Sequence, residues 1–115
     1  MKIKLIPLNR PGDKIEYGPI FDDEITLGRQ NSNLVVIDWS EDTNGTTTVS
    51  REHALIFQKE GKVYIKDLNS SYGTQIIRGE EQVSIKQCVE INIMIGDTIR
   101  LGKAVQLKLE MDKDL

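Results

Sequence analysis

Hydrophobic and polar residues alternate along several short stretches of the chain. The alternation is clearest over residues 105–111, and it is also present over residues 2–6 and 63–66. A period of two residues is typical of a β-strand with one buried face, because successive side chains of a strand point to opposite sides. The longer spacing of an amphipathic helix is almost absent. These stretches therefore predict antiparallel strands covered on one side.

Shorter apolar runs complete the pattern. They cover residues 25–27, 34–37, 54–57, 75–77 and 98–101. Each run is bounded by residues that favour turns, such as Gly28, Gly79 and Gly102. Many short strands at close spacing are typical of a β-sandwich or a β-barrel. The longest polar stretch, residues 40–49, predicts an extended loop.

Length and composition indicate one ordinary globular domain. The chain has 115 residues, with 38% hydrophobic and 29% charged residues, so one core can form without disulfide or metal staples. No apolar run approaches the ~18 residues of a membrane helix, and the N-terminal stretch has no signal-peptide core. We therefore expect a cytoplasmic monomer with no membrane partner. We place the domain at residues 1–111 and a C-terminal tail at residues 112–115.

The charge balance and the single cysteine narrow the function further. The formal net charge is −3 and the basic residues are scattered among acidic ones, so we expect no nucleic-acid partner. A site for an anion would have to concentrate positive charge locally. Cys88 cannot form an internal disulfide, and its apolar-alternating surroundings predict a buried, inert thiol.

Catalytic, cofactor and metal sites find little support. The sequence has no phosphate-binding loop and no dinucleotide fingerprint, and one histidine with one cysteine cannot build a zinc site. Ser50 and His53 could form a nucleophile and its base, but no nucleophile elbow surrounds the serine. We therefore predict no enzyme, no cofactor and no metal, and an enzyme of unknown type is the least supported alternative.

Three polar clusters lie between the predicted strands. They are Gly28-Arg29, Ser50-Arg51-Glu52-His53, and Asp67-Leu68-Asn69-Ser70-Ser71-Tyr72-Gly73-Thr74. If the three loops meet at one end of the fold, they bring together two arginines, serine hydroxyls and loop N–H groups. That mixture suits a dianionic phosphate, because arginine engages two oxygens at once while hydroxyls and amides fix the orientation.

In order and spacing, these clusters resemble the signature of the forkhead-associated (FHA) domain family: Gly-Arg, then Ser-Arg-x-His, then Asp-Leu-x-Ser-x-Asn-Gly-Thr. The likeness covers nearly the whole chain. It implies an all-β fold, a two-sheet antiparallel β-sandwich of about eleven short strands. It also implies a module that binds a phosphothreonine-containing partner in signalling and catalyses nothing.

The resemblance assigns roles to individual residues. It implies that the ligand is contacted by Arg29, Ser50, Arg51, Ser71 and Tyr72. It implies that the site is shaped by Gly28, His53, Gly73 and Thr74. In this family the loops also read residues beyond the phosphothreonine, and candidates for that role are Trp39, Thr47 and Thr48. Trp39 is alternatively an anchor in the core, which is the interpretation that we favour.

One departure from the signature leaves an alternative open. Tyr72 stands where the family has the asparagine that clamps the main chain of the ligand. A phenol cannot both donate and accept as an amide does. The sequence is therefore also compatible with an interaction or assembly module that does not depend on phosphate.

Overall fold

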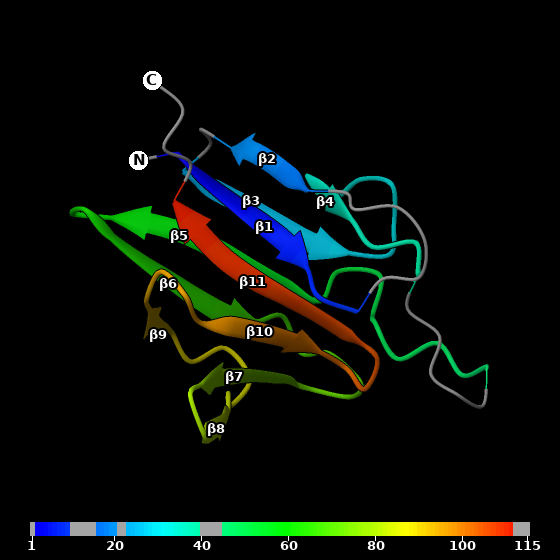
Figure 1. Ribbon diagram of the computed structural model, residues 1–115. Coiled ribbons are helices and arrows are strands. Elements are labelled where there is room, and N and C mark those ends of the chain that lie inside the picture. The colour runs from blue at the N-terminus through cyan, green and yellow to red at the C-terminus, as the bar shows by residue number, and fades with distance from the viewer. Residues whose placement is uncertain (1, 10–15, 21–22, 40–44, 112–115) are drawn as a thin grey trace.

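The computed structural model describes residues 2–9, 16–20, 23–39 and 45–111 (Figure 1). All regular elements of this part of the chain are β-strands, so it holds no helix that could cross a membrane. The strands are β1 (Ile3–Pro7), β2 (Tyr17–Ile20), β3 (Glu24–Gly28), β4 (Val35–Val36), β5 (Ala54–Lys59), β6 (Lys62–Asp67), β7 (Thr74–Arg78), β8 (Glu81–Ser84), β9 (Ile91–Ile93), β10 (Thr98–Leu101) and β11 (Val105–Met111).

The strands form two sheets that lie over one another (Figure 1). The six-stranded sheet has the order β2-β1-β11-β10-β7-β8, and the five-stranded sheet has the order β4-β3-β5-β6-β9. All strand pairs are antiparallel except β3 and β4. The predicted all-β sandwich of about eleven short strands is confirmed.

The core lies between the sheets and is built by the alternating positions. Val105, Leu107 and Leu109 of β11 are fully buried, while Gln106 and Lys108 between them are partly exposed. In the opposite sheet, Ile25, Ile56 and Ile65 are likewise fully buried. Each such side chain contributes roughly 1.5–3 kcal/mol on burial, so the register of the strands that carry them is fixed by their apolar faces.

The strand directions bring four loops to one end of the sandwich. β3, β6 and β10 end there, and β5, β7 and β11 begin there. The loops at this end include residues 29–34, 49–53, 68–73 and 102–104. The opposite end holds the β5–β6 and β7–β8 turns and the turn at residues 94–97. All three polar clusters therefore lie at the same end.

Some predictions from the sequence were wrong. Cys88 is exposed rather than buried, because it lies in the irregular segment before β9, with a positive φ of 62°. The apolar run at residues 34–37 forms a strand only over Val35–Val36. The expected tail at residues 112–115, and residues 40–44 of the expected loop, lie outside the described residues.

Candidate functional site

The first two polar clusters lie side by side because the backbone extends the β3–β5 pairing beyond the strand ends. Arg29 N–H donates to Ser50 O at 3.1 Å, and His53 N–H donates to Leu27 O at 2.8 Å. Gly28 is required by this close approach, since a Cβ there would lie 2.1 Å from Arg51 O. A side chain at position 28 would force the two segments apart.

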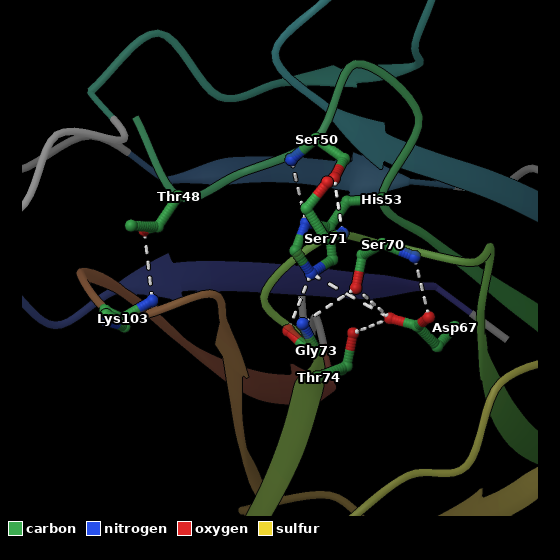
Figure 2. A network of polar contacts seen from close by, with 9 residues as sticks. All are labelled: Thr48, Ser50, His53, Asp67, Ser70, Ser71, Gly73, Thr74 and Lys103. Carbon is green, nitrogen blue, oxygen red and sulfur yellow. Dashed lines mark hydrogen bonds and ion pairs between the residues drawn. The ribbon is translucent and has the colours of Figure 1, made fainter. Parts of the chain in front are cut away.

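The third cluster is joined to the second by direct hydrogen bonds. Leu68 N–H donates to His53 O at 2.9 Å, and Ser71 N–H donates to Ser50 Oγ at 3.0 Å. Figure 2 shows Ser50 and Ser71 together above the buried part of the network. Arg29, Ser50 and Ser71, from three separate stretches of sequence, are thus held at one place.

His53 connects the loops from below and is fully buried. Its Nδ1 accepts from Ser50 N–H at 3.0 Å, so Nε2 carries the proton and donates to Gly73 O at 2.8 Å (Figure 2). Burial lowers the pKa of His53, although the Gly73 carbonyl and the Asp67 charge oppose this shift. Both ring nitrogens are occupied by main-chain partners, so the imidazole does not serve as a base for the Ser50 hydroxyl.

Asp67 organises the loop between β6 and β7. Its carboxylate accepts from Ser70 N–H at 2.9 Å, from Ser70 Oγ at 2.5 Å and from Thr74 Oγ1 at 2.6 Å. Ser70 Oγ in turn accepts from Gly73 N–H at 3.0 Å. Burial by itself would raise the pKa of Asp67, but the Ser70 and Thr74 hydrogen bonds outweigh it and hold the pKa below its ordinary value.

Gly73 is needed for its conformation rather than for space. Its φ is +86°, a region that favours glycine, while nothing lies within 4 Å of the position of a Cβ. The turn at Gly73 directs its carbonyl to His53 Nε2 and its N–H to Ser70 Oγ. Glycine is therefore needed at the two positions for different reasons: Gly28 allows a close approach of the backbone, and Gly73 allows a positive φ.

A pocket of about 420 Å³ opens over this network. It is lined by Arg29, Thr47, Thr48, Val49, Ser50, Arg51, Glu52, Asn69, Ser71 and Tyr72. All five residues predicted to contact a ligand belong to this lining, and they come from all three clusters. The predicted shaping residues lie around it, with His53 and Thr74 buried.

The pocket presents fixed donors for an anion. Arg29 Nε donates to Val49 O at 3.0 Å, which anchors the guanidinium, and no hydrogen bond from its two terminal nitrogens is found among the described residues. Ser50 Oγ accepts from Ser71 N–H, so its own O–H proton can be donated outward. Neither Arg29 nor Arg51 forms an ion pair with a carboxylate of the described residues. Glu52 supplies negative charge to the same lining.

Lys103 is a residue of this end that the sequence did not reveal. Its Nζ lies 5.3 Å from the centroid of the Tyr72 ring, and its N–H donates to Thr48 Oγ1 at 3.0 Å. Lys103 belongs to the turn between β10 and β11, outside all three signature clusters. Lys103 and Tyr72 are far apart in sequence, so their contact depends on the tertiary fold and cannot be predicted from a local motif.

The three candidates for reading the ligand beyond the phosphothreonine lie in different environments. Thr47 is exposed in the pocket lining. Thr48 is 1% exposed, and its hydroxyl helps to hold the β10–β11 turn. Trp39 does not line the pocket; it packs against the core, and its Nε1–H donates to Tyr17 Oη at 3.0 Å. Of the three, Thr47 is the best placed to reach a ligand.

The family comparison agrees with this geometry. The model of the FHA domain family matches residues 25–102, a span that includes all three clusters. The chain belongs to the FHA domain family. FHA domains are interaction modules rather than enzymes. No group of three or more metal-ligating side chains occurs in the part of the chain that the structure describes.

Solved structures agree with the fold. The FHA domain of a hypothetical protein from Arabidopsis thaliana has a TM-score of 0.74 and 24% identity, over 99% of this chain and 88% of the other. A second FHA structure, from a study of phosphothreonine-dependent FHA domain interactions, has a TM-score of 0.69 and 22% identity, over 99% and 100%. Mycobacterium tuberculosis EmbR, in complex with a low-affinity phosphopeptide, has a TM-score of 0.73 and 21% identity, over 99% of this chain and 26% of EmbR. No curated protein matches the sequence.

Proposed function

We propose that this FHA domain binds a phosphothreonine-containing segment of a partner protein in signalling. One observation carries the proposal: the pocket brings Arg29, Ser50, Arg51 and Ser71 together over a buried network that fixes their loops. Two of the solved relatives are described as phosphothreonine-dependent or as bound to a phosphopeptide, which supports the same ligand class here.

Each pocket group has a distinct role in this proposal. The Arg29 guanidinium engages phosphate oxygens, because the Val49 carbonyl already holds its Nε in place. Ser50 donates its hydroxyl proton to the phosphate, and Ser71 reaches the phosphate from the facing loop. The exposed Arg51 side chain adds positive charge at the rim. The task is recognition, so no base or nucleophile is required.

The experiment is calorimetric titration of a phosphothreonine peptide selected from an oriented library. Arg29→Ala should lower the affinity roughly ten- to hundredfold, since a hydrogen bond to a charged group is worth about 1.5–3 kcal/mol. Lys62→Ala is the control, because it removes a positive charge of an exposed residue at the opposite end of the sandwich. Equal affinities of the wild type and Arg29→Ala would refute the proposal.

The choice of phosphothreonine over phosphoserine is a finer part of the proposal. Burying the additional methyl group contributes about 0.8 kcal/mol, which corresponds to roughly a fourfold preference. The same titration with a phosphoserine peptide measures this ratio. A ratio of one would leave a phosphate site without threonine selectivity.

Tyr72 supports a second candidate, an interaction or assembly module that does not need phosphate. Tyr72 is 46% exposed and lines the pocket, where its ring offers an apolar contact in place of an amide clamp. Phosphatase treatment of a captured partner separates the two candidates. Binding that survives the treatment favours the second, and binding that is lost favours phosphothreonine recognition.

A further inference from the structure

Lys103 holds its ammonium over the ring of Tyr72, one of the residues that line the pocket. The distance from Nζ to the ring centroid is 5.3 Å, within the range of a cation–π interaction. Lys103 is not itself part of the pocket lining, but its contact with Tyr72 places a basic residue next to a lining that also holds Arg29 and Arg51. In the described part of the chain, no carboxylate lies within ion-pair distance of Lys103.

The backbone fixes the position of Lys103 relative to the pocket. Its N–H donates to Thr48 Oγ1 at 3.0 Å, and the N–H of the preceding Gly102 donates to Gly73 O at 3.0 Å. A Cβ on Gly102 would lie 2.2 Å from Thr48 O, so the β10–β11 turn is pressed against the pocket loop. Figure 2 shows Lys103 joined to Thr48 beside the Ser50–Ser71 network. These contacts therefore fix the position of the Lys103 backbone, from which the side chain extends.

The chemistry of this pair differs from that of an amide. A primary amide donates and accepts, so it recognises the main chain of any peptide. An ammonium has donors only, and this one lies over the ring of Tyr72, which lines the pocket. What this pair recognises best is an anion.

We propose that Tyr72 and Lys103 form a subsite for an aspartate or glutamate carboxylate that flanks the phosphothreonine of the ligand. The inference deepens the proposed function and rests on it, because the phosphate must first anchor the peptide in the pocket. The subsite makes the domain selective for acidic phosphothreonine segments.

The test uses phosphothreonine peptides in which a single aspartate is moved through the flanking positions, each paired with a peptide that has asparagine there. The readout is the ratio of the two affinities, measured by fluorescence anisotropy. We expect one position at which aspartate binds about two- to fivefold more tightly than asparagine, the value of an exposed ion pair. The ratio should fall as salt is added.

Four variants locate the effect. Lys103→Gln should bring the ratio close to one, and Lys62→Gln, a matched change at the opposite end, should leave it as in the wild type. Tyr72→Phe keeps the ring and should keep the preference, while Tyr72→Leu should reduce it. Lys103→Gln leaves the main-chain bond to Thr48 in place, so its melting temperature should match that of the wild type.

The outcomes separate this inference from the proposed function. A preference that persists in Lys103→Gln, or no preference at any position in the wild type, overturns the inference alone, provided that dephosphorylation still abolishes binding. If dephosphorylation has no effect on binding, the proposed function is wrong and the inference falls with it.

Discussion

A buried aspartate organises the loops at each end of the sandwich, but the two aspartates take their hydrogen bonds from different partners. Asp67 accepts from the Ser70 and Thr74 hydroxyls and from Ser70 N–H. Asp97, at the other end, accepts from Arg78 Nε at 2.8 Å and Nη2 at 2.7 Å, and from Met94 N–H at 2.8 Å. One end is fixed by neutral donors, and the other by an ion pair.

The difference decides which end can bind an anion. The Arg78 guanidinium is occupied by Asp97, so the positive charge at that end is neutralised within the protein. At the Asp67 end, hydroxyls and amides satisfy the carboxylate, and the neutral His53 links the loops. Arg29 and Arg51 are left to face the pocket. The fold is thus held at this end without using the charges that a phosphate requires.

The largest expected effect is a difference in the free energy of unfolding between variants that remove Asp67 and Asp97. Asp67→Ala strands the buried Ser70 and Thr74 donors, so we expect it to lower the free energy of unfolding by at least ~3 kcal/mol. Asp97→Ala should cost less, because the half-exposed Arg78 side chain returns to water. Urea denaturation measures both. Equal losses would contradict the contrast drawn between the two ends.

The next prediction uses pH. The pKa of His53 is lowered in the folded protein, so the unfolded chain takes up the proton more readily. The stability contributed by the neutral imidazole is complete above pH ~6.5 and is lost as the pH falls towards the folded pKa, by at most about 1.4 kcal/mol per pH unit. Because His53 is the only histidine, His53→Gln should flatten the stability curve between about pH 7 and pH 5. If the free energy of unfolding of His53→Gln depends on pH as steeply as that of the wild type, His53 is not the source of the pH dependence.

The smallest expected effect concerns the acidic residue of the pocket lining. Glu52 repels a phosphate, so Glu52→Gln should raise the affinity for the phosphopeptide by a factor of up to about five at low salt, and by less at high salt. Titrations at two ionic strengths measure this. Glu24→Gln, at the opposite end, is the control and should leave the affinity unchanged.

Much of the fold could be predicted because the alternation of apolar and polar residues follows the alternation of buried and exposed positions in a strand. β1, β6 and β11 were predicted from that pattern, since their apolar positions are the core positions. β8 was not predicted, because all four of its residues are exposed and no apolar face marks it. β2 contains Gly18 and Pro19, which are typical of turns, so its pairing with β1 depends on tertiary context.

The site residues that could be predicted are those that belong to local sequence motifs. Arg29, Ser50 and Ser71 stand within the signature clusters, and the structure brings them together. The interpretation of Trp39 as a core anchor is confirmed, but the hydrogen bond from its indole to Tyr17 was not predictable from local sequence. Lys103 was missed for a related reason: the turn that carries it reaches Thr48, Gly73 and Tyr72 only in the folded protein.

The most direct test of the account is an NMR titration of the ¹⁵N-labelled domain with a phosphothreonine peptide and with its unphosphorylated counterpart. We predict that only the phosphopeptide shifts the amide signals of Arg29, Ser50 and Ser71, while those of Met94 and Asp97 stay in place. Shifts gathered at the Asp97 end, or equal shifts with both peptides, would contradict the claim that one end is reserved for a phosphate.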